Sequence, residues 1–410
     1  MITYDVMIMG GGAAGLFAAA VLAERAPSLR VLVLEKGPKP LAKVRVSGGG
    51  RCNLTHQCTD IRAFTQNYPR GGRELIGAFH RFGPAETMAW FEAHGVPLVT
   101  LADGCVFPRS DTALDVISAL MSTARRGQTE IRTSAEVSRI RFFDGGVEVT
   151  VGEHSHETGR CLLVTTGGGA FAEGLDHTIE PCLPSLFTFN TPDRDFTALA
   201  GIVVQAVQLG GPGGIKADGE LLITHTGVSG PSVLCFSSFG ARGLAETGYR
   251  FDMQINWQPG QREEQVCESL TAHKQTAPRQ QTGTWSPLGL PVRLWKLLLQ
   301  RAGVNETCEW GGCPLAAIRR IAAQATAFTL PISGKNRHRG EFVTCGGIRL
   351  KEVDFRTMQS RLHPDLYFAG EVLDIDALTG GYNLQAAWTT AHLAAQAIAA
   401  GSRRSEVSGR

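Results

Sequence analysis

Glycines at fixed spacings near the N-terminus predict a phosphate-binding turn. Gly10, Gly12 and Gly15 satisfy G-x-G-x-x-G within GGGAAG, after a hydrophobic run and before an alanine-rich one. In such a strand–turn–helix the first glycine permits the turn, the second lets backbone approach a pyrophosphate, and the third lets helix and strand pack. Glu35 follows Gly15 by 20 residues, where an acid can bind ribose hydroxyls and would repel a 2′-phosphate. The alternative is a glycine turn with a surface glutamate.

A second glycine cluster, VSGGGRCNLTH at 46–56, has three possible interpretations: a phosphate cradle, a reactive thiol or a tight turn. Because the first cluster already takes the phosphate role, we do not expect this one to be the main phosphate cradle, and its glycines would position Arg51 and Asn53. Cys52 and Cys58 are separated by five residues, unlike the C-x4-C pair of disulfide reductases. A buried thiol next to the cofactor is therefore favoured over a redox disulfide.

Two stretches near the C-terminus favour FAD over NAD. YFAGEVLD at 367–374 is typical of a strand ending at Gly370 and Glu371, where a carboxylate can bind ribitol hydroxyls. Gly380, Gly381 and Asn383 then open an alanine-rich helix, whose N-terminal amides would face the N1–C2=O edge of a flavin. TTGGG at 165–169 ends another strand, as in many flavoproteins with two dinucleotide-binding folds. The alternative is an ordinary capped helix.

Few side chains stand out as acids or bases, and flavin chemistry needs few. Arg51 could bind a phosphate or a substrate anion, and a salt-bridged loop anchor is the equal alternative. Tyr382 could donate a proton; so could His225 in THTGVSGP, although a structural histidine is favoured there. The basic cluster GKNRHRGE at 334–341 could attract an anionic substrate or a nicotinamide phosphate, and a solvated loop is favoured. The sequence predicts no metal site.

These residues need a parallel α/β sheet to bring them together. The N-terminus is typical of a strand (4–9), a helix (13–25) and a second strand (30–34), which form a βαβ unit. Residues 110–127 predict a helix that Ser110 or Asp111 caps. After about Leu186, short alternating strands indicate a small antiparallel sheet or barrel, with a hairpin turn at 209–214.

The order of these patterns predicts an interrupted α/β protein. We expect a discontinuous Rossmann-like, two-dinucleotide-binding-type FAD domain over 1–187 and 341–410. An inserted antiparallel, β-barrel-like domain would cover 188–262 and 325–340, and a helical subdomain would cover 263–324.

Composition narrows the class of partner. The chain has 410 residues, 43% of them hydrophobic and 19% charged, with a formal net charge of +2. This balance predicts no nucleic-acid or membrane partner. Ten scattered cysteines without a C-x-x-C pair indicate reduced thiols. The apolar run 6–23 has no basic leader and is broken by glycines, so we read no targeting segment and expect a cytoplasmic protein.

The chain resembles the BaiN-like, aminoacetone-oxidase-type family of NAD(P)/FAD-dependent flavoprotein oxidoreductases. The matching blocks include MGGGAAGLFAA, KVRVSGGGRCNLTH, GELLITHTGVSGPSVL and the long stretch from FVTCGGIRL to TGGYNLQAA, which together span nearly the whole chain. The resemblance implies a two-dinucleotide-binding-fold FAD protein with an inserted barrel and helical domain. It also implies that Val137 touches the adenine through its backbone. With the residues read above, the set predicted at the cofactor is Gly10, Gly12, Ala13, Ala14, Gly15, Glu35, Lys36, Lys43, Gly49, Gly50, Arg51, Cys52, Asn53, Val137, Thr166, Gly167, Gly370, Glu371, Asp374, Gly380, Gly381, Tyr382, Asn383, Leu384 and Gln385.

Two departures from the family pattern stand out. GGAFAEGLDHTIEP, which follows TTG, is much shorter than the family's segment, so substrate access is expected to differ. The last helix carries WTTAHLAA where the family has smaller residues, which we expect to alter packing only.

We therefore expect an FAD-dependent oxidoreductase that passes hydride from NAD(P)H or an organic substrate to a small organic acceptor or oxygen. NAD(P)H would bind transiently, because no second G-x-G-x-x-G follows a strand. The alternatives are a flavin-bound redox sensor or interaction module without turnover, and a flavoprotein acting on a macromolecule such as tRNA. Substrate and oligomeric state are left open by the sequence.

Overall fold

The computed structural model describes residues 2–169, 173–336 and 343–408. The chain forms two compact units, Met1–Cys182 with Val343–Arg410, and Leu183–Phe342. The structure thus divides the chain near residues 182 and 342, where the sequence suggested 187 and 341. Residues 337–341 of the predicted basic cluster lie outside the described residues, as do residues 170–172 of the shortened loop.

The first unit is built on a mainly parallel sheet. Its central strands run in the order β21-β9-β1-β2-β6, all parallel, and the hairpin β7–β8 and the short pair β19–β20 extend it. The strands of this unit are β1 (Tyr4–Met9), β2 (Arg30–Leu34), β3 (Thr55–His56), β4 (Leu98–Thr100), β5 (Cys105–Pro108), β6 (Gln128–Arg132), β7 (Val137–Phe143), β8 (Gly146–Val151), β9 (Ser155–Val164), β10 (Ile179–Pro184), which runs into the second unit, β18 (Thr344–Ile348), β19 (Val353–Asp354), β20 (Gln359–Ser360) and β21 (Leu366–Phe368).

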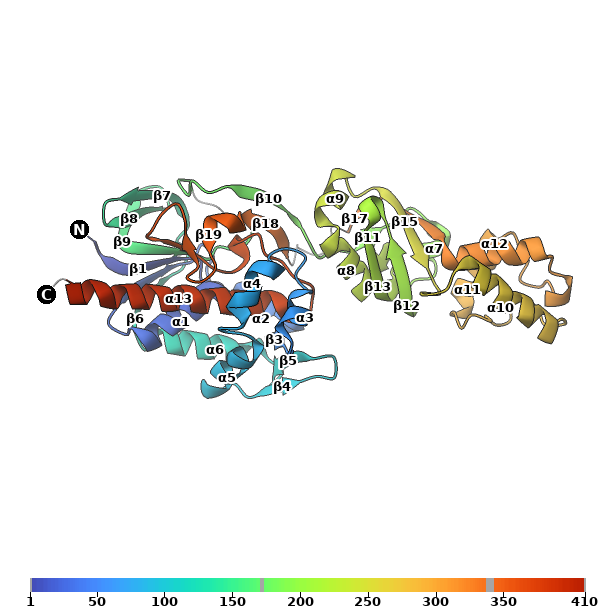
Figure 1. The fold of residues 1–410 in the computed structure, drawn as a ribbon, viewed down its shortest axis with the longest axis horizontal. Helices are drawn as coiled ribbons and strands as arrows, with labels where there is room; N and C mark the ends of the chain where they lie inside the picture. The colour runs from blue at the N-terminus through green and yellow to red at the C-terminus, as the bar shows by residue number, and fades with distance from the viewer. Residues whose placement is uncertain (1, 170–172, 337–342, 409–410) are drawn as a thin grey trace. The chain divides into compact units, whose positions relative to one another are not determined.

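Two long helices pack together on this sheet. The α1 helix (Ala13–Arg25) and the α13 helix (Tyr382–Ser408) lie side by side in Figure 1, and the rings of Phe17 and Trp388 meet at 5.3 Å. Because α1 is covered on both sides, its sequence is apolar all round and most of it is buried. The remaining helices of the unit are α2 (Ala42–Val46), α3 (Ile61–Thr65), α4 (Gly72–Phe79), α5 (Pro84–Ala93) and α6 (Ala113–Ala124).

The strand ends of this sheet gather the predicted site segments. Parallel strands place their carboxyl ends at one edge, and ligands of open α/β sheets bind there. The segments that leave that edge are Gly10 after β1, Glu35 after β2, Thr165–Gly167 after β9 and Gly370 after β21. The predicted βαβ unit is confirmed to the residue. The predicted cap of α6 is wrong, because Thr112 rather than Ser110 or Asp111 accepts the amide of Leu114.

The second unit combines an antiparallel sheet with helices around one core. The strands of its sheet follow the order β16-β15-β12-β13-β14-β11-β17. Only Ser333 separates β16 from β17 in the chain, and the Thr191 hydroxyl beside β11 donates to the Pro331 carbonyl of β16. The two edges of the sheet therefore lie close together, as in a barrel. The turn predicted at 209–214 joins β12 to β13. Its elements are β11 (Phe189–Asn190), α7 (Arg194–Thr197), β12 (Val203–Gly210), β13 (Lys216–Ile223), β14 (Gly227–Ser229), α8 (Pro231–Phe239), α9 (Ala241–Glu246), β15 (Phe251–Asn256), α10 (Glu263–Thr276), α11 (Val292–Arg301), α12 (Leu315–Thr326), β16 (Phe328–Ile332) and β17 (Gly334–Lys335).

The helices α10, α11 and α12 share buried side chains with that sheet. Trp257 beside the sheet, Trp295 of α11 and Ile318 of α12 belong to one hydrophobic cluster. The helical segment of the insertion is therefore packed on the sheet within a single compact unit.

Candidate functional site

The glycines that follow β1 differ in the structural reason for having glycine at each position. A Cβ at Gly10, whose φ is +114°, would lie 2.6 Å from the carbonyl oxygen of Thr165, and one at Gly15 would lie 1.9 Å from that of Gly10. Packing among β1, α1 and the segment after β9 therefore demands both glycines. Gly12 has an ordinary φ of −83°, and no atom of the described residues lies within 4 Å of a Cβ built there. Packing gives no reason for a glycine at 12, which faces open space.

The start of α1 is prepared for an anion. Gly12 is its N-cap, no side chain caps it, and its first turn carries no acidic residue. The first helical hydrogen bond runs from Leu16 N to Gly12 O, so the amides of Ala13, Ala14 and Gly15 form the open end of the helix. The positive end of the helix dipole thus faces the open space at Gly12, an arrangement that binds phosphates.

Glu35 is held at the end of β2 beside this turn. Its two carboxylate oxygens accept the amides of Gly11 and Gly37, each at 2.7 Å. Each oxygen keeps a further lone pair, which suits the hydroxyls of a ribose. The following residue, Lys36, is exposed, and Ala135, which bonds back to the Glu35 carbonyl, leads into Val137 at the start of β7. The structure thus brings Gly10–Gly15, Glu35 and the approach to Val137 to one place.

A second group of predicted residues meets around Glu371. Lys43 forms an ion pair with one carboxylate oxygen of Glu371 at 2.7 Å, and Thr344 N donates to the other at 3.1 Å. Gly167, which follows Thr166, lies against both side chains: a Cβ there would sit 3.4 Å from Glu371 and 3.9 Å from Lys43. The Lys43 side chain is largely exposed, so the pair can open toward a ligand.

Two neighbouring predictions support the backbone here. Asp374 is buried and accepts the amide of Gly346 at 3.0 Å. Gly370 lets its turn pack on α1, because a Cβ there would lie 2.9 Å from that of Ala14. Both residues shape the edge of the sheet that carries Glu371.

The second glycine cluster is fastened to the start of α13. Trp388 Nε1 donates to Leu54 O at 3.0 Å, and the Thr55 hydroxyl donates to Gln385 Oε1 at 2.6 Å. A Cβ at Gly381 would strike the Thr55 backbone at 2.4 Å, so only glycine allows this approach. The side chain of Asn53, just before these contacts, has a buried Oδ1 without a hydrogen-bond partner among the described residues. A buried acceptor left unpaired is costly, and a ligand donor would satisfy it.

The predicted residues in the first turn of α13 have different surroundings. Asn383 accepts the amide of Ala377 and donates to the carbonyls of Ala377 and Leu378, which fixes the preceding loop. Leu384 is partly exposed, and the helix carries no acidic residue in its first turn.

The glycines of the second cluster itself are open. A Cβ at Gly49, whose φ is +71°, would meet no described protein atom within 4 Å, and one at Gly50 would meet only the Arg45 carbonyl oxygen, at 3.9 Å. Packing therefore leaves room beside both residues, as the prediction of a nearby cofactor requires.

Two predicted cofactor contacts have no exposed surface. Cys52 and Gln385 are wholly buried. The Gln385 amide group also donates to the hydroxyls of Thr87 and Thr389, so its polar atoms are already paired. Cys52 is thus buried, as expected for a thiol next to the cofactor, and in this conformation the Gln385 side chain holds the helix start in place and offers no surface to a ligand.

The three candidate catalytic residues differ in their contacts and exposure. The Arg51 guanidinium lies over the Phe107 ring at 4.3 Å and reaches the Asp111 carboxylate at 3.5 Å, which is the loop-anchor alternative. His225 is exposed in the turn between β13 and β14 of the second unit, whereas the other candidates belong to the first. Tyr382 is 7% exposed, and burial raises the pKa of its hydroxyl to about 12.

Three residues near Tyr382 were not predicted. His56, Asp103 and Cys105 lie beside its ring because β3 pairs with β5, which sets His56 opposite Cys105. The signal available in the sequence was the position of His56 at the end of the glycine-rich stretch. The pairing of two short strands 49 residues apart could not be read from it.

Replacing Cys52 by alanine should leave flavin reduction and reoxidation unchanged within about twofold. Burial raises the pKa of this thiol to about 12, so it stays neutral at physiological pH and is a poor nucleophile. All ten cysteines are free thiols in the structure. Iodoacetamide labelling of the native protein at pH 8, read by mass spectrometry, should modify the partly exposed Cys58 and spare Cys52. Rapid labelling of Cys52 would contradict the assignment.

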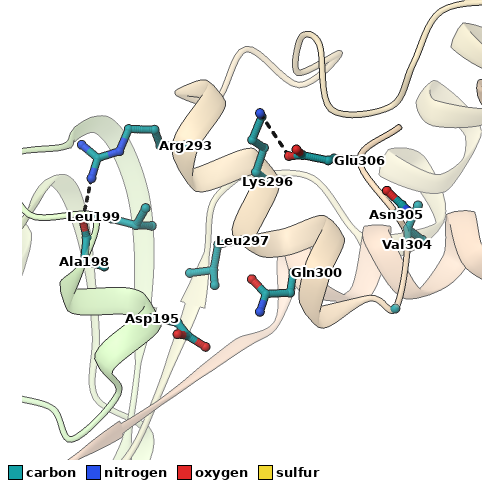
Figure 2. Close-up of a pocket in the computed structure, with 11 residues that line it drawn as sticks. Asp195, Ala198, Leu199, Arg293, Lys296, Leu297, Gln300, Val304, Asn305 and Glu306 are labelled. Carbon is teal, nitrogen blue, oxygen red and sulfur yellow. Dashed lines mark hydrogen bonds and ion pairs between the residues drawn. The ribbon is translucent and has the colours of Figure 1, made fainter. Parts of the chain in front are cut away.

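A separate cavity lies away from these residues. About 590 Å³ in volume, it lies in the second unit between α7 and α11. Figure 2 shows Arg293 bonded to the Ala198 carbonyl and Lys296 paired with Glu306 at its rim. Opposite charges already pair there, so its lining points to no particular ligand class.

Residues 2–169, 173–336 and 343–408 contain neither a membrane-spanning helix nor a metal-binding cluster. None of their helices is long and apolar enough to cross a membrane. No three of their histidine, cysteine, aspartate or glutamate side chains are grouped to hold a metal ion.

Comparison with known proteins identifies the family. The HI0933-like protein Rossmann domain matches residues 4–397. The 3-dehydro-bile acid delta(4,6)-reductase of Clostridium scindens is 28% identical over 96% of this chain and 98% of its own, and the ribosomal RNA dihydrouridine synthase of Escherichia coli is 27% identical over 97% and 98%. Among solved structures, a 3-ketosteroid-delta4-(5alpha)-dehydrogenase from Rhodococcus jostii RHA1 has a TM-score of 0.49 at 14% identity, covering 97% of both chains. The chain therefore belongs to the HI0933-like Rossmann-domain family and is a BaiN-like flavoprotein oxidoreductase, as its motifs predicted.

Proposed function

We propose that this protein is an FAD-dependent reductase of carbon–carbon double bonds conjugated to a carbonyl group, with NAD(P)H as the electron donor. The observation that carries the proposal is Gly12. Its neighbours Gly10 and Gly15 are glycines because the fold needs them, whereas Gly12 faces open space at the uncapped end of α1. A pyrophosphate is the group that needs a glycine there.

The other residues at this edge fit the rest of FAD. Glu35 would accept the hydroxyls of the adenosine ribose, and Glu371 those of the ribitol chain. The first turn of α13 and the unpaired Asn53 Oδ1 would face the flavin ring. When bound, a flavin supplies a hydride at its N5 atom. The protein supplies position, hydrogen bonds and a dry surface.

The substrate class follows from the names of the relatives. A delta(4,6)-reductase and a dihydrouridine synthase both add hydrogen across a carbon–carbon double bond. The shared chemistry is hydride addition to one carbon and proton addition to the other. A small molecule is favoured over RNA here because the near-balanced charge of +2 offers no basic surface excess for a polyanion.

RNA remains the second candidate because the curated relatives from Escherichia coli and Haemophilus influenzae both carry the dihydrouridine synthase name. A flavin-bound sensor without turnover is the third. The three separate by experiment, since only a reductase consumes an acceptor and only an RNA enzyme requires a polynucleotide.

The donor is tested by anaerobic mixing of the flavin-loaded protein with NADH or NADPH, followed at the flavin absorbance band. We expect bleaching by one of the two within seconds. The reduced protein from each mixture is then mixed, in separate samples, with uridine-containing RNA and with 2-cyclohexen-1-one. Absence of bleaching by either nucleotide would remove NAD(P)H from the proposal, and recovery of colour with RNA alone would favour the second candidate.

A further inference from the structure

A cluster of titratable side chains lies beside the first turn of α13. His56 of β3 stacks on Tyr382, with ring centroids 4.8 Å apart and planes at 21°. Its Nδ1 lies 4.0 Å from Cys105 Sγ. The Asp103 carboxylate, in the turn before Cys105, accepts the Cys105 amide at 3.0 Å.

The two ring nitrogens of His56 face different neighbours. A Cβ at Gly104 would lie 2.5 Å from Nε2, so this side of the ring rests on the turn that carries Asp103. A Cβ at Gly380 would lie 3.5 Å from Nδ1, so the other side faces the glycines that open α13. The ring is only partly buried and can exchange protons with solvent.

We propose that His56 is the proton donor for substrate reduction at this site, an inference that rests on the proposed function. An imidazole can give and regain a proton near neutral pH. The Tyr382 ring, stacked on the imidazole, fixes the plane of the His56 ring. His56 then takes the role for which Tyr382 was a candidate from sequence.

Tyr382 is better suited to be a platform. Its ring is packed against Phe64 at 5.0 Å and Tyr68 at 6.0 Å as well as His56. Its backbone carbonyl accepts the Tyr68 hydroxyl at 2.6 Å, which holds the first turn of α13 in place. A phenol whose pKa is raised by burial also gives up its proton less readily, which makes it a weaker acid.

The proposed step balances. The β-carbon of the substrate receives a hydride with its electron pair, drawn in the end from NAD(P)H. The π electrons of the double bond shift to the α-carbon. The N–H bond of the imidazolium breaks, and its proton forms the new C–H bond at that carbon. Neutral His56 then takes a proton from solvent, so the substrate gains two electrons and two hydrogens.

The test compares His56→Asn and His56→Gln with His154→Asn, a control on an exposed turn of the same unit. With 2-cyclohexen-1-one as acceptor, we expect enone reduction by both His56 variants to fall roughly 100- to 10,000-fold, the usual share of a general acid. FAD affinity and flavin reduction by NAD(P)H should be unchanged. If the wild type reduces the enone and the His56 variants reduce it equally fast, the inference is overturned. If the wild type itself does not reduce the enone, the proposed function is contradicted instead.

Discussion

Replacing Gly12 with valine should give a folded protein that no longer holds FAD. A Cβ at this position meets no atom within 4 Å in the part of the chain that the structure describes, and the backbone angle suits any residue, so the fold has room for the new side chain. The same side chain would occupy the space through which a pyrophosphate reaches the amides of α1. We expect FAD affinity to fall by at least about 100-fold, since a charged group kept from its hydrogen bonds loses several kcal/mol.

The matched control is Gly15→Val, three residues along. Its Cβ would lie 1.9 Å from the carbonyl oxygen of Gly10, so this variant should fail to fold or should unfold at a much lower temperature. FAD titration by fluorescence and thermal unfolding by circular dichroism separate the two outcomes. A Gly12→Val protein that retains FAD as tightly as wild type would contradict the assigned pyrophosphate position.

Replacing Arg70 with methionine should destabilise the first unit by about 3–5 kcal/mol. Arg70 forms a two-pronged ion pair with Asp376, whose carboxylate is fully buried, and removal of the guanidinium takes this cation away from a buried negative charge. The pair joins the chain before α4 to the segment that leads into α13. The hydrogen bond from Leu378 N to Asn67 O runs between the same two segments.

The control for this ion pair is the double variant Arg70→Met with Asp376→Leu. Because both charges are removed, most of the lost stability should return, although the first turn of α13 then depends on apolar packing alone. Urea unfolding gives the free energies. Equal losses in the single and double variants would show that the pair acts through something other than its charges.

Local patterns predicted the frame of the first unit. The residues Tyr4–Met9, Ala13–Arg25 and Arg30–Leu34 form the strand, helix and strand expected, because their apolar runs and the glycine break carry the information locally. Gly167 and Glu371 meet because β9 and β21 are parallel and end at one edge, whereas Lys43, which only the family resemblance placed near the cofactor, reaches them from α2.

The features that the sequence did not predict depend on contacts between residues far apart in the chain. Arg51 was ambiguous because its partners, Phe107 and Asp111, lie more than 50 residues away and no local signal links them. His56 was overlooked for the same reason, since the β3–β5 pairing creates its surroundings. The family resemblance placed Gln385 at the cofactor, whereas its hydrogen bonds run inward to Thr55 and Thr87.

A single-turnover measurement tests the central claim most directly. The protein is loaded with FAD, reduced anaerobically by one equivalent of dithionite, and mixed with 2-cyclohexen-1-one. Flavin absorbance and product mass are followed together. The proposed function predicts one FAD per chain, recovery of the oxidised flavin band, and one cyclohexanone formed per flavin. A protein that takes up no FAD, or a reduced flavin that recovers only with oxygen and yields no cyclohexanone, would contradict it.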